Sequence, residues 1–122
     1  MKNLSVAVVE DEGIVAMDIK KSLIALGYKV PFVADSGELV LENLKSVKPD
    51  LILMDVVLKG ELDGIETAKT VYELYNIPVI FLTAFEDENT LKRAMQLNNY
   101  GFLTKPFEDS MLKDVIQSLL TE

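Results

Sequence analysis

Cysteine, histidine and tryptophan are all absent from this sequence of 122 residues. Without cysteine there is no disulfide and no thiolate metal site, and without histidine there is no imidazole ligand, imidazole base or phosphohistidine. No apolar run approaches the roughly 18 residues of a membrane span, and no leader precedes the first predicted strand. These absences favour a cytoplasmic protein, away from any membrane, whose chemistry depends on carboxylates, lysine, hydroxyls and backbone groups.

Basic residues are fewer than acidic ones, with 12 Lys and Arg against 20 Asp and Glu, and the net charge is −8. Direct binding to nucleic acid or to an anionic membrane needs a basic surface, so both are disfavoured. A hydrophobic content of 49% and a length of 122 residues favour one folded domain over a disordered chain, and we expect residues 1–122 to form it.

Short apolar segments alternate with longer amphipathic ones along the whole chain. The pattern predicts strands at 4–9, 28–34, 51–54, 78–82 and 101–103. It predicts helices at 14–26, 37–47, 65–75, 88–97 and 111–120, with Gly27 as the C-terminal stop of the first. Pro31 suggests that the second strand is an edge, and Leu39, Val40 and Leu44 are expected on the inner face of the second helix. Five such units predict an α/β fold, a doubly wound parallel sheet between two layers of helices.

Polar residues follow four of the five predicted strands. In such sheets ligands bind beyond the carboxyl ends of the strands, so these residues are expected to share one rim. The second strand is followed by Asp35 and Ser36, which suit a helix N-cap. The residues after the other strands are Glu10-Asp11-Glu12, Asp55, Thr83 and Lys105.

The acids of this rim predict a site for a hard cation. Converging carboxylates repel one another unless a cation intervenes, and all-oxygen ligands favour Mg²⁺, with Mn²⁺ as the alternative. A competing interpretation is that residues 10–12 only begin a helix, whose N-terminus suits acids. Asp55 follows four apolar residues and has no capping role, so it is either a metal ligand or a nucleophile for a phosphoryl group. Thr83 and Lys105 could then bind phosphoryl oxygens.

The strings at 8–12, 53–55, 81–84 and 101–107 resemble the receiver domain of two-component response regulators, of the chemotaxis-regulator type, and the likeness runs from Leu4 to Leu120. The resemblance implies a flavodoxin-like (βα)5 fold with strand order 2-1-3-4-5. It implies Asp55 as phosphoacceptor and metal ligand. It also implies Asp11 as a direct Mg²⁺ ligand, Glu10 as a ligand acting mainly through water, and the backbone carbonyl of Val57 as a further ligand.

The resemblance also implies a switch and its partners. Thr83 would be the switch hydroxyl, Lys105 the phosphate partner and Phe102 the switch aromatic. The phosphodonor would be a sensor histidine kinase or a histidine phosphotransfer protein. The signal would leave through the face of the fourth helix, fifth strand and last helix, towards an output domain, a target protein or a second copy in a homodimer formed on activation. Such a protein accepts and slowly hydrolyses phosphate without being an enzyme in the ordinary sense.

Two departures and three alternatives bear on this interpretation. Val57 and Phe85 are apolar where side chains of the family can influence the attacking water, which predicts slow autodephosphorylation. A flavodoxin would need a phosphate-binding first loop without acids, and an aspartyl phosphatase would place a second Asp at the position of Val57. A phosphorylation-independent pseudo-receiver, acting only as an interaction module, remains as the alternative function.

Overall fold

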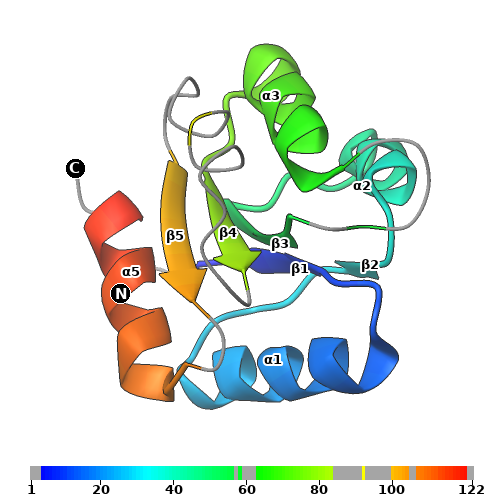
Figure 1. Ribbon diagram of the computed structural model, residues 1–122. Helices are drawn as coiled ribbons and strands as arrows, with labels where there is room; N and C mark the ends of the chain where they lie inside the picture. Colours follow the sequence, from blue (N-terminus) through cyan, green and yellow to red (C-terminus); the bar gives the residue numbers. More distant parts are fainter. Residues whose placement is uncertain are drawn as a thin grey trace.

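The computed structural model describes residues 4–56, 58, 63–83, 92, 100–104 and 107–120. No helix of this described part is long and apolar enough to cross a membrane. The helix expected at 88–97 falls outside the described residues, apart from Lys92. The elements run in the order β1 (Val6–Val9), α1 (Gly13–Ala25), β2 (Val33–Ala34), α2 (Gly37–Leu44), β3 (Leu51–Asp55), α3 (Gly64–Tyr75), β4 (Val79–Thr83), β5 (Tyr100–Thr104) and α5 (Asp109–Leu120) (Figure 1).

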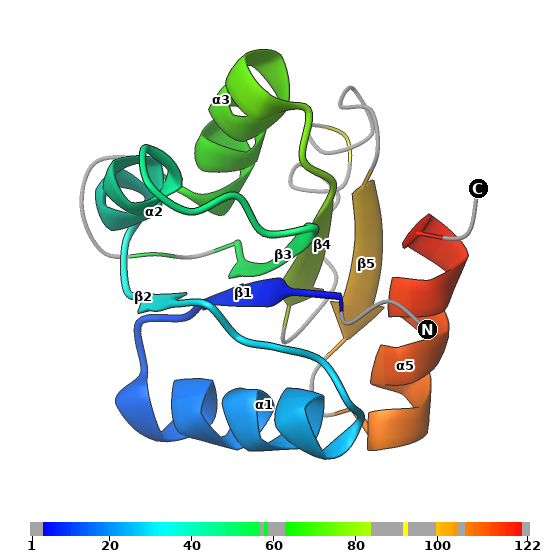
Figure 2. The same cartoon turned by 180° about the vertical axis from the view of Figure 1, so that it is seen from behind.

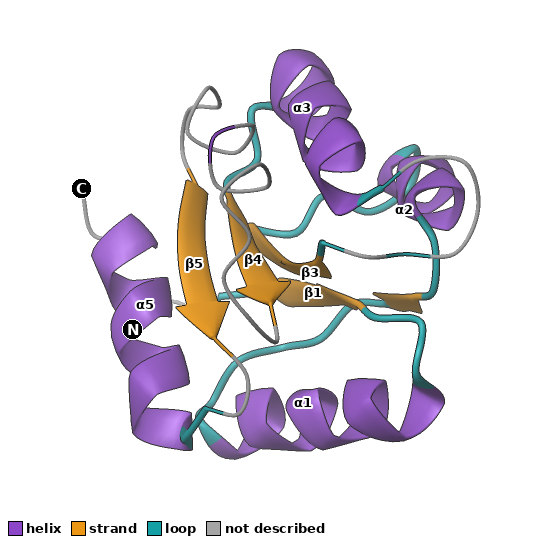
Figure 3. Cartoon of the chain, in the orientation of Figure 1, coloured by secondary structure: helices purple, strands orange, loops and turns teal. Residues whose placement is uncertain are grey.

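The five strands form one parallel sheet in the order β2-β1-β3-β4-β5 (Figure 3). In its register Val9 lies opposite Met54, and Thr83 lies opposite Thr104. The carboxyl ends of β1, β3, β4 and β5 are therefore aligned along one rim. This arrangement is a flavodoxin-like fold, so the predicted fold class and strand order are confirmed.

Helices cover both faces of the sheet. Helices α1 and α5 lie on one face, and α2 and α3 lie on the other (Figures 1 and 2). Alternate residues of β1 pack on opposite faces of the sheet. Val6 and Val8 belong to one core cluster, and Ala7 and Val9 belong to the other. Burial on both faces explains why the central strands have continuous apolar sequences instead of alternating ones.

The second strand is much shorter than the expected segment at 28–34, because only Val33 and Ala34 form a strand. Proline has no N–H to donate to a neighbouring strand, and Pro31 interrupts the segment. Upstream of it, only an isolated bridge between Ser5 and Lys29 continues the pairing with the β1 side. The edge position predicted from Pro31 is confirmed.

The C-terminal end of α1 agrees with the prediction, and that of α2 does not. Gly27 follows α1 with a φ of 98°, a conformation that favours glycine, and it ends the helix as predicted. Helix α2 ends at Leu44 instead of Val47, where the chain closes in tight turns. Val40 and Leu44 are fully buried, but the inward position expected for Leu39 is wrong because this side chain is 40% exposed. One residue of helix turns a side chain by about 100°, which places Leu39 on the flank of α2 beside Val40.

Candidate functional site

Three carboxylates meet at the carboxyl ends of β1 and β3. Glu10 and Asp11 directly follow β1, and Asp55 is the last residue of β3. One carboxylate oxygen from each of the three lies within 4.8 Å of the other two. Glu10 is buried, with only 2% of its surface exposed, while Asp11 and Asp55 are partly exposed. The site is therefore an acidic cluster with one buried carboxylate and two that solvent partly reaches.

Backbone hydrogen bonds fix where two of these acids stand. The N–H of Glu10 donates to the carbonyl of Ala34 at 2.9 Å, which extends the β1–β2 pairing by one residue. Beyond Asp55, the N–H of Val56 donates to the carbonyl of Leu82 at 3.3 Å and extends the pairing of β3 with β4. The sheet therefore sets the spacing of the acids, so the site is built on rigid elements.

The first helix does not use these acids as caps. Glu12 is the N-cap residue of α1, but its side chain accepts no capping hydrogen bond, and the first turn contains no acid. The carboxylate of Glu10 instead accepts the N–H of Glu12 at 3.2 Å. The interpretation of residues 10–12 as a simple helix start therefore does not explain the position of Glu10.

The donor set fits a small divalent cation. An octahedral Mg²⁺ binds oxygen at about 2.0–2.1 Å, so opposite ligands lie about 4.2 Å apart. Oxygens within 4.8 Å of one another are close to that separation. A ligand that contacts the ion through a water molecule would account for the part of the separation beyond about 4.2 Å. Oxygen-only chemistry disfavours zinc, which prefers nitrogen and sulfur ligands. The cluster therefore fits the Mg²⁺ site that the sequence predicts.

The other predicted site residues are only partly described. Thr83 is the last residue of β4 and lies opposite Thr104 in the register, so its backbone stands on the same rim as Asp55. Lys105 follows Thr104 in sequence. The Thr83 side chain and all of Val57, Phe85 and Lys105 lie outside the described residues.

Phe102 lies in β5 and faces the α2–α3 side of the sheet. Its ring packs against the fully buried Phe81 of β4, with 5.6 Å between the ring centroids and 38° between the planes. Aromatic pairs at this separation are attractive beyond the area that they bury. The predicted switch aromatic is thus partly buried and packed on the core next to β4.

The return of the chain from Asp55 to α3 involves residues that the sequence analysis did not single out. Asp63 and Glu66 form a capping box, in which each side chain accepts the backbone N–H of the other residue, at 2.8 and 3.1 Å. Gly64 lies against the backbone of Asp55 and Val56. The spacing of an Asp and a Glu three residues apart before an apolar helix is a capping-box signature and could have located this helix start.

Comparison with known proteins agrees with this fold. Residues 6–117 match the family described as the response regulator receiver domain. The chain therefore belongs to the receiver domain family of response regulators. The match is to the family as a whole, and the likeness to chemotaxis regulators in particular stays a prediction.

Two curated relatives are about twice as long as this chain. The chain is 33% identical over 112 residues to the transcriptional regulatory protein PdtaR of Mycobacterium tuberculosis (strain H37Rv), covering 92% of this chain and 54% of that protein. It is 32% identical over 119 residues to the alkaline phosphatase synthesis transcriptional regulatory protein PhoP of Bacillus subtilis, covering 97% of this chain and 49% of PhoP. The chain thus spans about half the length of these relatives.

Solved structures show the same fold. The signal receiver domain of a modulated diguanylate cyclase from Desulfovibrio desulfuricans G20 superposes with a TM-score of 0.92 at 35% identity, covering 98% of this chain and 95% of that chain. The signal receiver domain of a signal transduction histidine kinase from Syntrophus aciditrophicus gives 0.84 at 30% identity, covering 96% and 89%. This similar domain therefore occurs in proteins of different kinds.

Proposed function

We propose that this protein is a phosphorylation-activated signalling receiver in which Asp55 accepts a phosphoryl group. The observation that carries the proposal is the cluster of Glu10, Asp11 and Asp55, with carboxylate oxygens within 4.8 Å of one another at the rim of the sheet. An aspartate at the end of a buried strand, beside two acids and open to solvent on one side, suits a nucleophile that a large donor must reach.

The transfer exchanges one bond to phosphorus for another. A carboxylate oxygen of Asp55 forms a bond to phosphorus, and the bond from phosphorus to a nitrogen of the donor's phosphohistidine breaks. The imidazole leaves with the electron pair of the broken bond and takes up a proton. The product on this chain is an acyl phosphate at Asp55.

Mg²⁺, or Mn²⁺ in its place, would be held by Glu10, Asp11, Asp55 and the backbone carbonyl of Val57. When bound, the ion offsets negative charge on the oxygens of the transferring phosphoryl group. Glu10 contributes from a buried position, and burial of its carboxylate in this cluster favours a bound cation because an isolated buried charge is costly. The chain's other polar groups, the Thr83 hydroxyl and the Lys105 ammonium, would bind the remaining phosphoryl oxygens.

A response to phosphorylation would pass from Thr83 to Phe102. The two residues lie on neighbouring strands, and the Phe102 ring already contacts the core through Phe81. A shift of Phe102 would alter the face of β5, α5 and the segment 88–97, and so control an output domain, a target protein or a homodimer. Because Phe102 has no hydroxyl, it would act through packing alone.

The partners follow from what the chain lacks. Membership of the receiver family implies a histidine kinase partner in general. With no histidine of its own, the chain would receive phosphate from a sensor histidine kinase or a histidine phosphotransfer protein, in the cytoplasm. Residues 1–122 would act as one receiver unit, which stores phosphate at Asp55 and turns over slowly instead of working as an ordinary enzyme.

Intact-mass measurement tests this function. The protein is incubated with Mg²⁺ and acetyl phosphate beside Asp55→Asn and a matched control, Asp35→Asn, which changes an exposed acid after β2. We expect a phosphate-sized increment in the wild type and in Asp35→Asn, and none in Asp55→Asn or after chelation of Mg²⁺. No increment in the wild type would support a pseudo-receiver, and an increment in Asp55→Asn would remove Asp55 from its role.

A further inference from the structure

Helix α1 is apolar on its outer as well as its inner side. Ala16, Ile19 and Leu23 are buried against the sheet. On the outside, Ile14 is 88% exposed, Met17 is 53% exposed and Ile24 is 54% exposed. Single exposed apolar residues are ordinary, but three on one helix of 13 residues call for an explanation.

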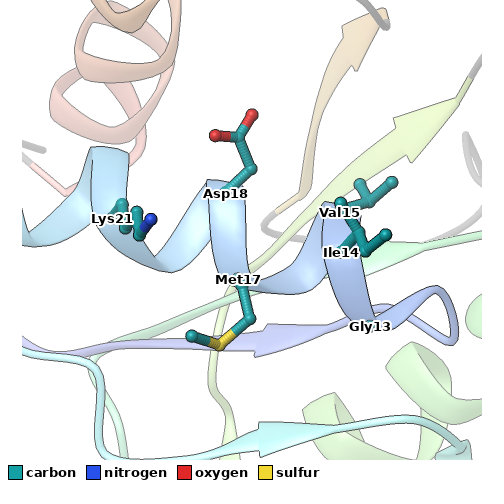
Figure 4. Close-up of a pocket in the computed structure, with 6 residues that line it drawn as sticks. All are labelled: Gly13, Ile14, Val15, Met17, Asp18 and Lys21. Carbon is teal, nitrogen blue, oxygen red and sulfur yellow. The ribbon is translucent and has the colours of Figure 1, made fainter.

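These side chains lie on one stripe. We call the residues of this stripe the α1 seam: Ile14, Met17, Lys21 and Ile24. They follow one another at steps of three, four and three residues, which is the spacing of core positions in a coiled coil. The long aliphatic stem of Lys21 continues the apolar surface between Met17 and Ile24. Figure 4 shows Ile14 near the start of α1, Met17 and Asp18 in its middle, and Lys21 about one turn further on. With Gly13 and Val15, these residues line an open hollow on the helix.

The seam continues onto neighbouring elements. Met17 also lines a second hollow with Val33 of β2 and Leu39 of α2, which are 37% and 40% exposed. Among the described residues, five of the eight large hydrophobic side chains that are exposed therefore gather on or beside α1. An apolar surface of this kind, with a polar edge, is typical of a protein–protein contact.

The charges of the seam are arranged to complement a second copy of the same helix. Asp18 and Lys21 are both exposed, and within the described part of the chain neither forms an ion pair. The seam is symmetric about the level of residue 19. A two-fold rotation there would bring Ile14 onto Ile24 of the second copy and Lys21 onto Met17 of the second copy.

We propose that the unphosphorylated protein self-associates through the α1 seam, with the two helices antiparallel. In this arrangement Lys21 of each copy lies beside Asp18 of the other, so two ion pairs form at the edge of the apolar contact. A parallel pair would instead place Lys21 against Lys21 of the second copy, and like charges disfavour that arrangement. Isologous pairing of one surface with itself is the usual geometry of a homodimer.

The contact is small. A helix of 13 residues is about 20 Å long, and a single-helix contact buries less than the ~800 Å² per partner of a standard interface. We therefore expect a weak dimer, with a dissociation constant of about 10–500 µM. Met17 lines a hollow together with Glu10 and Asp11, so a second copy at the seam would obstruct a bulky phosphodonor. This last consequence, competition between self-association and phosphorylation, rests on the proposed function.

Sedimentation equilibrium from about 10 µM to about 1 mM tests the proposal, because mass action must populate the dimer over this range. Ile24→Asp changes the end of the seam that is far from Asp55, and Leu74→Asp, 66% exposed on α3, is the matched control. We expect the wild type and Leu74→Asp to dimerise alike and Ile24→Asp to dimerise at least about 10-fold more weakly. Asp18→Lys and Lys21→Asp should each weaken the dimer, and the two together should restore it.

Two results would overturn the proposal. One is a wild type that stays monomeric throughout the range, and the other is a dimer that Ile24→Asp leaves intact. If the wild type is monomeric and Ile24→Asp slows phosphate transfer from a phosphorylated histidine phosphotransfer protein but not from acetyl phosphate, the seam binds the donor instead. Labelling of Asp55 by acetyl phosphate is measured separately, so failure of the dimer and failure of the proposed function remain distinguishable.

Discussion

The backbone N–H of Gly64 donates a hydrogen bond to the carbonyl oxygen of Val56, 2.8 Å away. This bond brings the start of α3 back against the end of β3, directly beside Asp55. A Cβ atom added at Gly64 would overlap the backbone carbonyl oxygen of Asp55 and lie 2.9 Å from the Cα of Val56. The lack of a side chain at Gly64 therefore allows the close packing that holds the end of β3 at Asp55 in place.

Replacement of this glycine should damage the fold. We expect Gly64→Ala to lower the free energy of unfolding by about 2 kcal/mol or more, because backbone atoms would have to move. The measurement is urea unfolding followed by circular dichroism. Gly13→Ala is the control, since a Cβ there would meet nothing within 4 Å, and it should change stability by less than about 1 kcal/mol. Equal effects of the two substitutions would contradict the packing argument.

Metal binding should depend on Asp11. We expect Asp11→Asn to weaken Mg²⁺ binding at least about 10-fold, because an amide oxygen carries no net charge to offer a hard cation. Isothermal titration with Mg²⁺ measures the effect. Asp114→Asn, an exposed acid on α5, removes the same charge elsewhere and should bind Mg²⁺ like the wild type. If both variants lost affinity equally, overall charge and not a site would account for binding.

The contact between Phe81 and Phe102 should contribute to stability. We expect Phe102→Ala to lower the free energy of unfolding by about 1–2 kcal/mol, less than for a fully buried ring because Phe102 is only partly buried. Thermal and urea unfolding both report the change. Met111→Ala, at a side chain that is 43% exposed, should cost clearly less. A loss at Phe102 no larger than at Met111 would show that the ring pair does not stabilise the core.

Much of the architecture could be predicted because it depends on local rules. Continuous apolar runs at β1 and β3 identify strands buried on both faces, and Gly27 marks the end of α1 by its positive φ. The position of Pro31 correctly predicted an edge. It did not reveal that only Val33 and Ala34 pair as a strand, because that length depends on how neighbouring backbone meets β1.

The candidate site was partly predictable for a related reason. Glu10, Asp11 and Asp55 stand at strand ends, and parallel topology alone brings strand ends to one rim, so their convergence was expected before the structure. The role of Gly64 could not be predicted, since its close approach to Asp55 is a tertiary contact that no local pattern encodes. Leu39 was placed wrongly because its helical spacing is compatible with an inward position, and only packing decides the rotation of α2.

The most direct test of the central claim is to identify the residue that carries the phosphate. After incubation with acetyl phosphate and Mg²⁺, borohydride reduces an aspartyl phosphate to homoserine, which peptide mass spectrometry locates in the sequence. We predict homoserine at position 55 and at no other acid of the chain. Homoserine at Asp11 or at another aspartate, or a phosphate that borohydride leaves unchanged, would contradict the assignment of Asp55 as the phosphoacceptor.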